Sequence, residues 1–281
     1  MDRFSQPPIP QPKRPLLRFI ILLTTVALAS AGHVFPQSPS DQANRTTVPP
    51  QVTQVAAAVN PMEEPLRLLA EARKAYQDVR DYSCTMIKKE RIRGQLQPEN
   101  VVSMKVRTEP FSVYLRWQQP KTMAGQEACY VAGKNDGKMR VHATGLLGVA
   151  GWVTVDPNDE RAKKTSNHAI TEAGIGNLLA RFTRSWEKEK DLNLTRVRIG
   201  EYDYNKRRCI RVETIHPNNR GNQFVSYRSV LYFDKQTHLP IRVETYDWPS
   251  NEGSGDGELR EVYSYINMKL NIGLGDDAFN Y

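Results

Sequence analysis

The stretch VSYRSVLYFDKQTHLPIRVETYD, residues 225–247, decides the fold class. Two runs of largely alternating apolar and polar residues, 225–233 and 241–246, flank a polar turn that contains Asp234 and His238. This pattern is typical of a β-hairpin, two antiparallel strands joined by a short turn. Because successive side chains of a strand point to opposite faces, we expect the hairpin to bury one face and expose the other.

Similar extended runs fill most of the last two hundred residues. Glycines and prolines such as Gly94, Pro98 and Pro110 separate them, as expected at turns. Strands and helices do not alternate along the chain, so the pattern favours an antiparallel sheet over a parallel one. The other predicted strands are residues 82–92, 101–108, 111–117, 127–131, 138–143, 152–155, 195–202, 208–215 and 259–270.

Two segments have the spacing of helices that pack one face on a sheet. In residues 65–79 an apolar residue recurs every three or four positions, beginning at Leu68. In residues 170–186 the apolar stripe contains Leu178, Leu179 and Phe182. Gly174 and Gly176 are expected to weaken the first turn of this second helix.

The first 60 residues predict an exported protein. Residues 13–31, KRPLLRFIILLTTVALASA, combine a basic flank, an apolar run and a small-residue site that ends at Ala31. We interpret residues 1–31 as a signal peptide cleaved after Ala31, with an uncleaved anchor as the alternative. Residues 32–60 are rich in Pro, Gln, Ser, Thr and Ala and are predicted to be a disordered tether. Residues 61–281 are then one domain in the periplasm or cell envelope.

The net charge gives no indication of a nucleic-acid partner. The formal charge is +8, of which residues 1–31 contribute +3, because four basic residues there oppose Asp2. The remaining +5 is spread over the rest of the chain, whereas nucleic-acid binding needs a concentrated basic stripe. Membrane contact is expected only through the leader, and only if the leader stays attached.

Cysteine and histidine spacing predicts no metal site. Cys84, Cys129 and Cys209 are far apart and form no Cys-x-x-Cys pair. Each lies in a predicted strand. The sequence leaves two alternatives for each cysteine, a buried free thiol or one half of a disulfide. The five histidines, 33, 142, 168, 216 and 238, are scattered singly and are expected at the surface or in turns.

Catalytic motifs are missing as well. The sequence contains neither a Gly-x-Ser-x-Gly elbow nor a glycine-rich phosphate loop after a strand. Its nearest carboxylate pairs fall at apparent turns or termini. We therefore predict a protein that is not an enzyme, with no catalytic residue and no cofactor.

One row of apolar side chains is the remaining functional signal. If the sheet curves, alternate residues line its concave side and form a groove that binds an apolar ligand. The alternative is that the helices fill this space and the row is ordinary core. The candidate ligand-binding residues are Val102, Met104, Val106, Val113, Leu115, Trp117, Leu231, Phe233, Ile241 and Val243.

Several short motifs resemble a known family. DYSCTM at 81–86, GQEACY at 125–130, GKNDG at 133–137 and ITEAGIGNL at 170–178 resemble the bacterial family called domain of unknown function 1571. That family has no established activity, so the resemblance implies no catalytic residue.

A more distant resemblance extends over the whole domain. The initial helix, the strands that lead into residues 231–244, and the ending NIGLGDDAF at 271–279 resemble the LolA/LolB-like superfamily. This resemblance implies an exported half-barrel that carries lipoprotein acyl chains or other lipid-like ligands.

The resulting expectation is an α+β fold: a strongly curved antiparallel sheet, a LolA-like half-barrel, with helices covering its concave face. The expected function is non-enzymatic binding of a lipid or acylated partner in the apolar groove.

One alternative is a structural or sensory envelope module that binds a protein or cell-wall polymer through Tyr114, Arg116, Arg211 and Tyr246. Another is an enzyme whose site is assembled from residues far apart in sequence. An open apolar cavity favours the first, a solid core the second, and a cleft with converging carboxylates or histidines the third.

Overall fold

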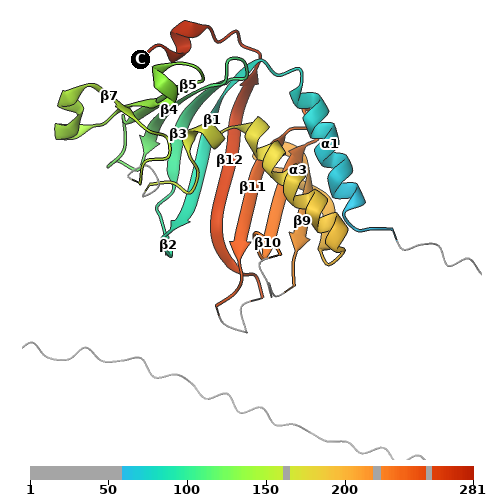
Figure 1. Ribbon diagram of the computed structural model, residues 1–281. Coiled ribbons are helices and arrows are strands. Elements are labelled where there is room, and N and C mark those ends of the chain that lie inside the picture. Colours follow the sequence, from blue (N-terminus) through green and yellow to red (C-terminus); the bar gives the residue numbers. More distant parts are fainter. Residues whose placement is uncertain (1–58, 161–164, 218–222, 251–254) are drawn as a thin grey trace, which may run out of the picture. The chain divides into compact units, whose positions relative to one another are not determined.

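A computed structural model of the 281-residue chain describes residues 59–160, 165–217, 223–250 and 255–281 (Figure 1). The predicted signal peptide and nearly all of the predicted tether lie outside the described residues.

The described strands form one antiparallel sheet of twelve strands. Their order is β7-β6-β5-β4-β3-β1-β12-β11-β10-β9-β8, with β2 paired to β1. The first six, with their bounds, are β1 Asp81–Ile92, β2 Gln95–Leu96, β3 Asn100–Arg107, β4 Ser112–Gln119, β5 Glu127–Val131 and β6 Met139–His142. The other six are β7 Trp152–Val155, β8 Arg196–Tyr204, β9 Arg207–Ile215, β10 Arg228–Asp234, β11 Pro240–Asp247 and β12 Glu258–Leu270.

The pairing of β1 with β12 joins the two halves of the sheet. Strands β3 to β7 extend outward from β1, and strands β11 to β8 extend outward from β12. In the central pair, Met86 lies opposite Tyr265, Lys88 opposite Tyr263, and Glu90 opposite Glu261. Residues almost two hundred positions apart are therefore neighbours in the middle of the sheet.

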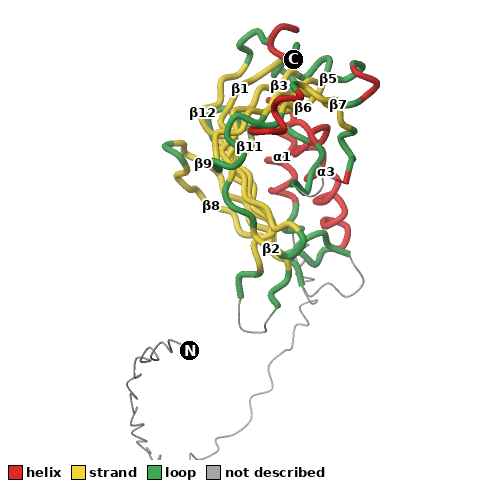
Figure 2. The backbone as a smooth tube through the Cα atoms, turned by 90° about the vertical axis from the view of Figure 1, so that its left-hand side faces the viewer, coloured by secondary structure: helices red, strands yellow, loops and turns green. Residues whose placement is uncertain are grey.

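The sheet is open, and the strong curvature predicted from the sequence is wrong. The edge strands β7 and β8 lie at opposite ends of the strand order and do not close on each other. Seen from the side, the sheet is a layer that is not strongly curled (Figure 2). Alternation along a strand shows which face is buried but gives no information on the coiling of the whole sheet.

Among the described elements, two α-helices cover one face of this sheet (Figure 2). They are α1 Glu63–Tyr76 and α3 Ile175–Leu192. Their apolar stripes are buried against the strands, as the helical spacing predicted, and Trp186 of α3 is 0% exposed. The described ranges also contain four short 3-10 helices: η1 Asn135–Gly137, η2 Gly145–Ala150, η3 Ile170–Glu172 and η4 Asp276–Phe279.

Helix α3 begins later than predicted, because η3 and an extended turn occupy residues 170–174. The backbone N–H of Ile175 donates a hydrogen bond of 2.9 Å to the hydroxyl of Tyr82. A Cβ atom on Gly174 would lie 2.8 Å from that hydroxyl, and one on Gly176 would lie 2.6 Å from the ring of Tyr76. The two glycines therefore make room for tyrosines that hold the start of the helix.

The opposite face of the sheet is partly covered by the end of the chain. The Tyr281 ring stacks on Tyr114 with 4.3 Å between centroids, and Ala278 and Phe279 pack beside them. Tyr114 is only 6% exposed. Tyr114, one of the residues expected to bind a protein or cell-wall polymer, is therefore covered by the chain itself.

The three cysteine thiols are buried and free, on β1, β5 and β9. Burial raises the pKa of Cys84 to about 12 and that of Cys129 to about 11. Of the two alternatives left open by the sequence, the structure has the buried thiol.

Candidate functional site

A cavity of about 690 Å³ lies between the sheet and α3. Side chains from β1, β4, β5, β6, β7, β11 and β12 form its sheet side. Residues 165–170 and 172–174, together with the first half of α3, form the opposite side. The helices do not fill the space between themselves and the sheet.

The wall formed by β4 to β7 is almost entirely apolar. These four strands are consecutive in the sheet, so their inward-pointing side chains form one continuous surface. The side chains that line the cavity here are Leu115, Trp117, Ala128, Met139, Val141 and Val155.

Three of the ten predicted ligand-binding residues, Leu115, Trp117 and Val243, line this cavity. Phe233 borders a second, small pocket of about 100 Å³, which Leu68 of α1 also lines. Five others are buried in the core and do not line the large cavity: Val102, Met104, Val106, Val113 and Leu231.

Ile241 is on the opposite face of the sheet from the cavity. Tyr232 of β10 pairs with Arg242, but the next residue, Phe233, pairs with Pro240. Ile241 is thus the extra residue of a β-bulge, and it packs with Cys209 and Val230 on the outer face. Simple alternation placed it beside Val243 and was wrong.

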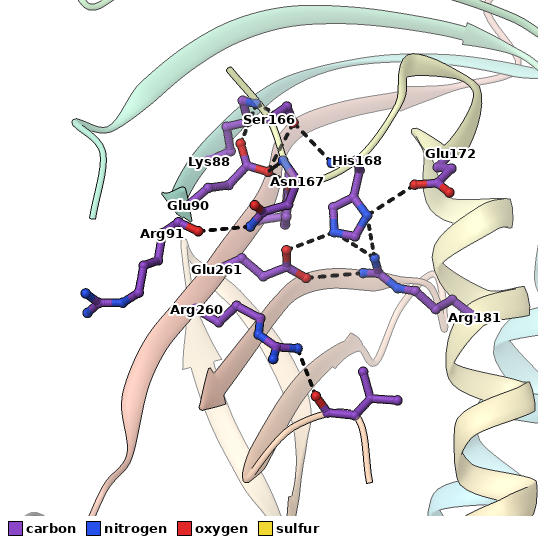
Figure 3. A network of polar contacts seen from close by, with 12 residues as sticks. Lys88, Glu90, Arg91, Ser166, Asn167, His168, Glu172, Arg181, Arg260 and Glu261 are labelled. Atoms are coloured by element: carbon purple, nitrogen blue, oxygen red, sulfur yellow. Dashed lines mark hydrogen bonds and ion pairs between the residues drawn. The ribbon is translucent and has the colours of Figure 1, made fainter. Parts of the chain in front are cut away.

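Beside this apolar wall, polar residues from β1, β12, the 166–172 segment and α3 form a connected network (Figure 3). Its centre on β1 is Glu90, which is 3% exposed. The Lys88 ammonium donates to Glu90 at 2.7 Å, and Ser166 and the backbone N–H of Asn167 donate at 3.1 and 3.0 Å. The hydroxyl of Tyr263 also donates to Glu90.

His168 forms the second part of the network. Its Nε2 atom lies 2.8 Å from a carboxylate oxygen of Glu261 on β12, and its Nδ1 atom lies 3.3 Å from Glu172. Arg181 of α3 approaches the His168 ring and lies 3.7 Å from the second oxygen of Glu261. Figure 3 shows these side chains pointing toward one another from the sheet, the 165–172 segment and α3.

Both buried carboxylates of the network have a lowered pKa. For Glu90, burial raises the pKa, but the charge of Lys88 and the donated hydrogen bonds outweigh burial. For Glu261, burial again raises the pKa, and the hydrogen bond and charge of His168 together with the charge of Arg181 outweigh it. The folded state therefore favours ionised carboxylates that tie the segment before α3 to the central strands.

This network was not predicted from the sequence. His168 was expected at the surface or in a turn as a single histidine. The signal was in residues 81–92, where Lys88 and Glu90 continue the row of Tyr82, Cys84 and Met86. Two charged residues in an otherwise apolar row indicate a buried pair, because charges are seldom buried alone.

Of two further histidines, His238 lies where the sequence predicted and His216 does not. His238 lies in the turn between β10 and β11, as predicted. His216 is 1% exposed, with Nε2 3.0 Å from Glu189 of α3 and Nδ1 2.6 Å from the carbonyl of Ser226. Its surface assignment was wrong, because the acidic partner comes from a distant helix.

The outer-face residues of the alternative hypothesis do not form one free surface. Tyr114 is covered by the end of the chain, whereas the Arg116 side chain is 60% exposed. The Arg211 side chain is 27% exposed and pairs with Glu213, and Tyr246 donates to Glu244.

Neither a metal cluster nor a membrane-crossing helix is found in the described part of the chain. There, no three His, Cys, Asp or Glu side chains are grouped so that they hold a metal ion. None of the described helices is both long and apolar enough to cross a membrane.

Several solved structures are similar to the chain at low identity. An uncharacterised conserved protein from Thermus thermophilus is 10% identical over 78% of this chain and 94% of its own, with a TM-score of 0.44. The Mycobacterium tuberculosis lipoprotein LppX is 9% identical over 75% of this chain and 96% of its own, with a TM-score of 0.43. A LolA superfamily protein from Nitrosomonas europaea is 12% identical over 76% and 96%, with a TM-score of 0.34.

Sequence comparison confirms the predicted family. No curated protein matches the chain. A family model described as "Protein of unknown function (DUF1571)" matches residues 79–281, which include every strand of the sheet and helix α3. The chain therefore belongs to the DUF1571 family.

Proposed function

We propose that this protein binds a lipid or an acylated partner, without catalysis, and holds an acyl chain in the cavity between β4–β7 and α3. The observation that supports this proposal is the open cavity of about 690 Å³ with an apolar wall. Leu115, Trp117 and Val243 are the predicted residues that we assign to the acyl chain.

The size and lining of the cavity suit such a ligand. Small-molecule sites typically have volumes of roughly 300–1,000 Å³ and mostly apolar walls. Each methylene group that leaves water for an apolar site stabilises the complex by about 0.8 kcal/mol. An acyl chain therefore gains binding free energy even when only part of it enters the cavity.

The leader supports an envelope location in this proposal. Residues 1–31 act as a signal peptide and residues 32–60 as a tether, and residues 61–281 form the binding domain. An exported protein meets lipids and acylated proteins at the membrane that it has crossed.

The converging polar groups raise the alternative of an enzyme, and their contacts favour a structural role. The hydroxyl of Ser166 donates to Glu90 at 3.1 Å and is not aimed at the His168 ring. His168 is engaged by Glu261 and Glu172. A nucleophile needs a hydrogen bond to its general base, and Ser166 makes its bond to a carboxylate that Lys88 already neutralises.

Filling the cavity tests the proposal. Val141 of β6 lines the cavity, whereas Val106 of β3 is 0% exposed in the core and does not line it. Val141→Trp should reduce uptake of a fluorescent fatty-acid probe at least tenfold, about 1.4 kcal/mol in binding free energy. Its thermal midpoint should stay near that of the wild type, because the added ring enters empty space.

Val106→Trp is the matched control. It inserts the same ring into packed core, where overpacking typically costs about 1–3 kcal/mol of stability. If wild type takes up no probe, or if Val141→Trp binds it as well as wild type, the cavity is not the lipid site. Release of fatty acid from an ester substrate, detected by mass spectrometry, would contradict the non-enzymatic role.

A further inference from the structure

We propose that the ligand carries an anionic head group, a carboxylate or a phosphate, and that Arg184 with Arg181 holds it at the mouth of the cavity. This inference rests on the proposed function and adds the chemical class of the ligand. It follows from where the apolar and the charged side chains of the cavity lie.

The charged side chains that line the cavity lie apart from its apolar β4–β7 wall. The side chains from β4 to β7 are those of the apolar wall, including Leu115, Met139 and Val141. The charged side chains that line the cavity come from β1, from the segment before α3 and from α3 itself. A ligand that matches both sides has an apolar chain and a charged end.

The two arginines lie where such a charged end meets solvent. Residues 181 and 184 are three positions apart on α3, so they lie on the same helix face. Both line the cavity, the Arg181 side chain is 37% exposed, and Arg184 is also exposed. A group bound between them reaches the aqueous mouth while the rest of the ligand extends inward.

The ion pairs among the charged residues that line the cavity leave Arg184 available to bind a ligand. Among the described residues, the lining holds three cations, Lys88, Arg181 and Arg184, and one anion, Glu172. Lys88 is neutralised by Glu90, and Arg181 shares Glu261 with His168. Glu172 is engaged by His168.

Arg184 makes no ion pair with any residue in the described ranges. Glu90 and Glu261 are 3% and 5% exposed, do not line the cavity, and are already paired within the network. The charge that an entering ligand meets without a counter-ion is thus positive, and it is carried by a guanidinium group.

The guanidinium group of Arg184 favours an anionic head group on the ligand. A guanidinium group presents parallel N–H donors that match the two oxygens of a carboxylate or phosphate. An exposed ion pair contributes little free energy on its own. The acyl chain therefore supplies most of the affinity, and the arginines supply the preference among ligands of equal chain length.

The test compares ligands that differ only at the head. Hexadecanoic acid, hexadecyl phosphate and hexadecanol each displace a neutral fluorescent lipid from the full chain at pH 8. The two anionic ligands should bind about fivefold more tightly than the alcohol, the upper end for an exposed ion pair. Arg184→Gln should remove this preference and leave the affinity for hexadecanol unchanged.

Lys188→Gln is the matched control, because Lys188 is exposed on the same helix and does not line the cavity. It should keep the preference. Equal affinity of wild type for acid and alcohol would overturn the head-group inference and leave the proposed function standing. Displacement by inorganic phosphate alone would overturn it in favour of a free-anion site. Failure to bind any of the three amphiphiles would overturn the proposed function, and this inference with it.

Discussion

Gly174 is the residue on which the start of α3 depends. Its backbone has φ +93° and ψ 166°, a region that essentially only glycine adopts. A Cβ atom there would also lie 2.8 Å from the Tyr82 hydroxyl, which accepts the Ile175 N–H. Gly174→Ala should therefore lower the free energy of unfolding by about 1–3 kcal/mol, measured by urea denaturation.

Gly200 provides the comparison. It lies on the edge strand β8, its φ is not in the left-handed region, and a Cβ there would meet nothing within 4 Å. Gly200→Ala should leave stability unchanged or slightly raised. Equal stability of Gly174→Ala and wild type would show that the start of α3 is held in another way.

Single positions also show the limit of reading faces from sequence. Val102, Met104 and Val106 follow strict alternation and are buried as predicted. Ile241 has the same spacing from Val243 but points outward, because a bulge shifts its register. A bulge depends on the partner strand, and the local sequence does not contain that information.

At the scale of elements, the polar network fastens the segment before α3 to the two central strands. Glu90 accepts from Ser166 and from the Asn167 N–H, and Glu261 holds His168. Removing one member of a buried pair leaves the other uncompensated. Glu90→Gln should therefore cost about 3–5 kcal/mol of stability at neutral pH.

The same variant should change how stability depends on pH. Because the folded state lowers the pKa of Glu90 from its ordinary value of 4.5, its contribution is fully present above that value. This contribution is lost as the pH falls through the lowered, folded-state pKa. Denaturation measured from pH 6 to pH 3 should show a shallower fall for Glu90→Gln than for wild type.

The control is Glu187→Gln, at an exposed position on α3. The stability of this variant should fall with pH as steeply as that of the wild type. A Glu90→Gln profile parallel to that of wild type would mean that the pKa of Glu90 is not lowered by folding.

The elements themselves were largely predictable, and their contacts were not. The strands predicted at residues 127–131 and 152–155 agree with β5 and β7. The helix predicted at 170–186 starts five residues late, because Gly174 and Gly176 belong to contacts with Tyr82 and Tyr76. The local spacing of apolar residues predicts a helix. It gives no information on tyrosines that approach the helix from other elements.

At the scale of the whole domain, the cavity follows from how the helices are placed. Figure 1 shows α1 and α3 over the half of the sheet formed by β9 to β12. The inner face of β4 to β7 lies beyond them and remains as the apolar wall of the cavity. Of this wall, the sequence pattern identified only Leu115 and Trp117 on β4. The exposure of the wall depends on the position of α3 and was not predictable.

The central claim is that an acyl chain occupies this cavity, and methionine methyl NMR tests it most directly. Met86 and Met139 line the cavity, whereas Met62 is buried elsewhere and does not line it. With methionine methyls labelled with carbon-13, hexadecanoic acid should give intermolecular NOEs from its methylenes to Met86 and Met139, and none to Met62. Saturating ligand without NOEs to either cavity methionine, or with NOEs only to other methionines, would contradict the account.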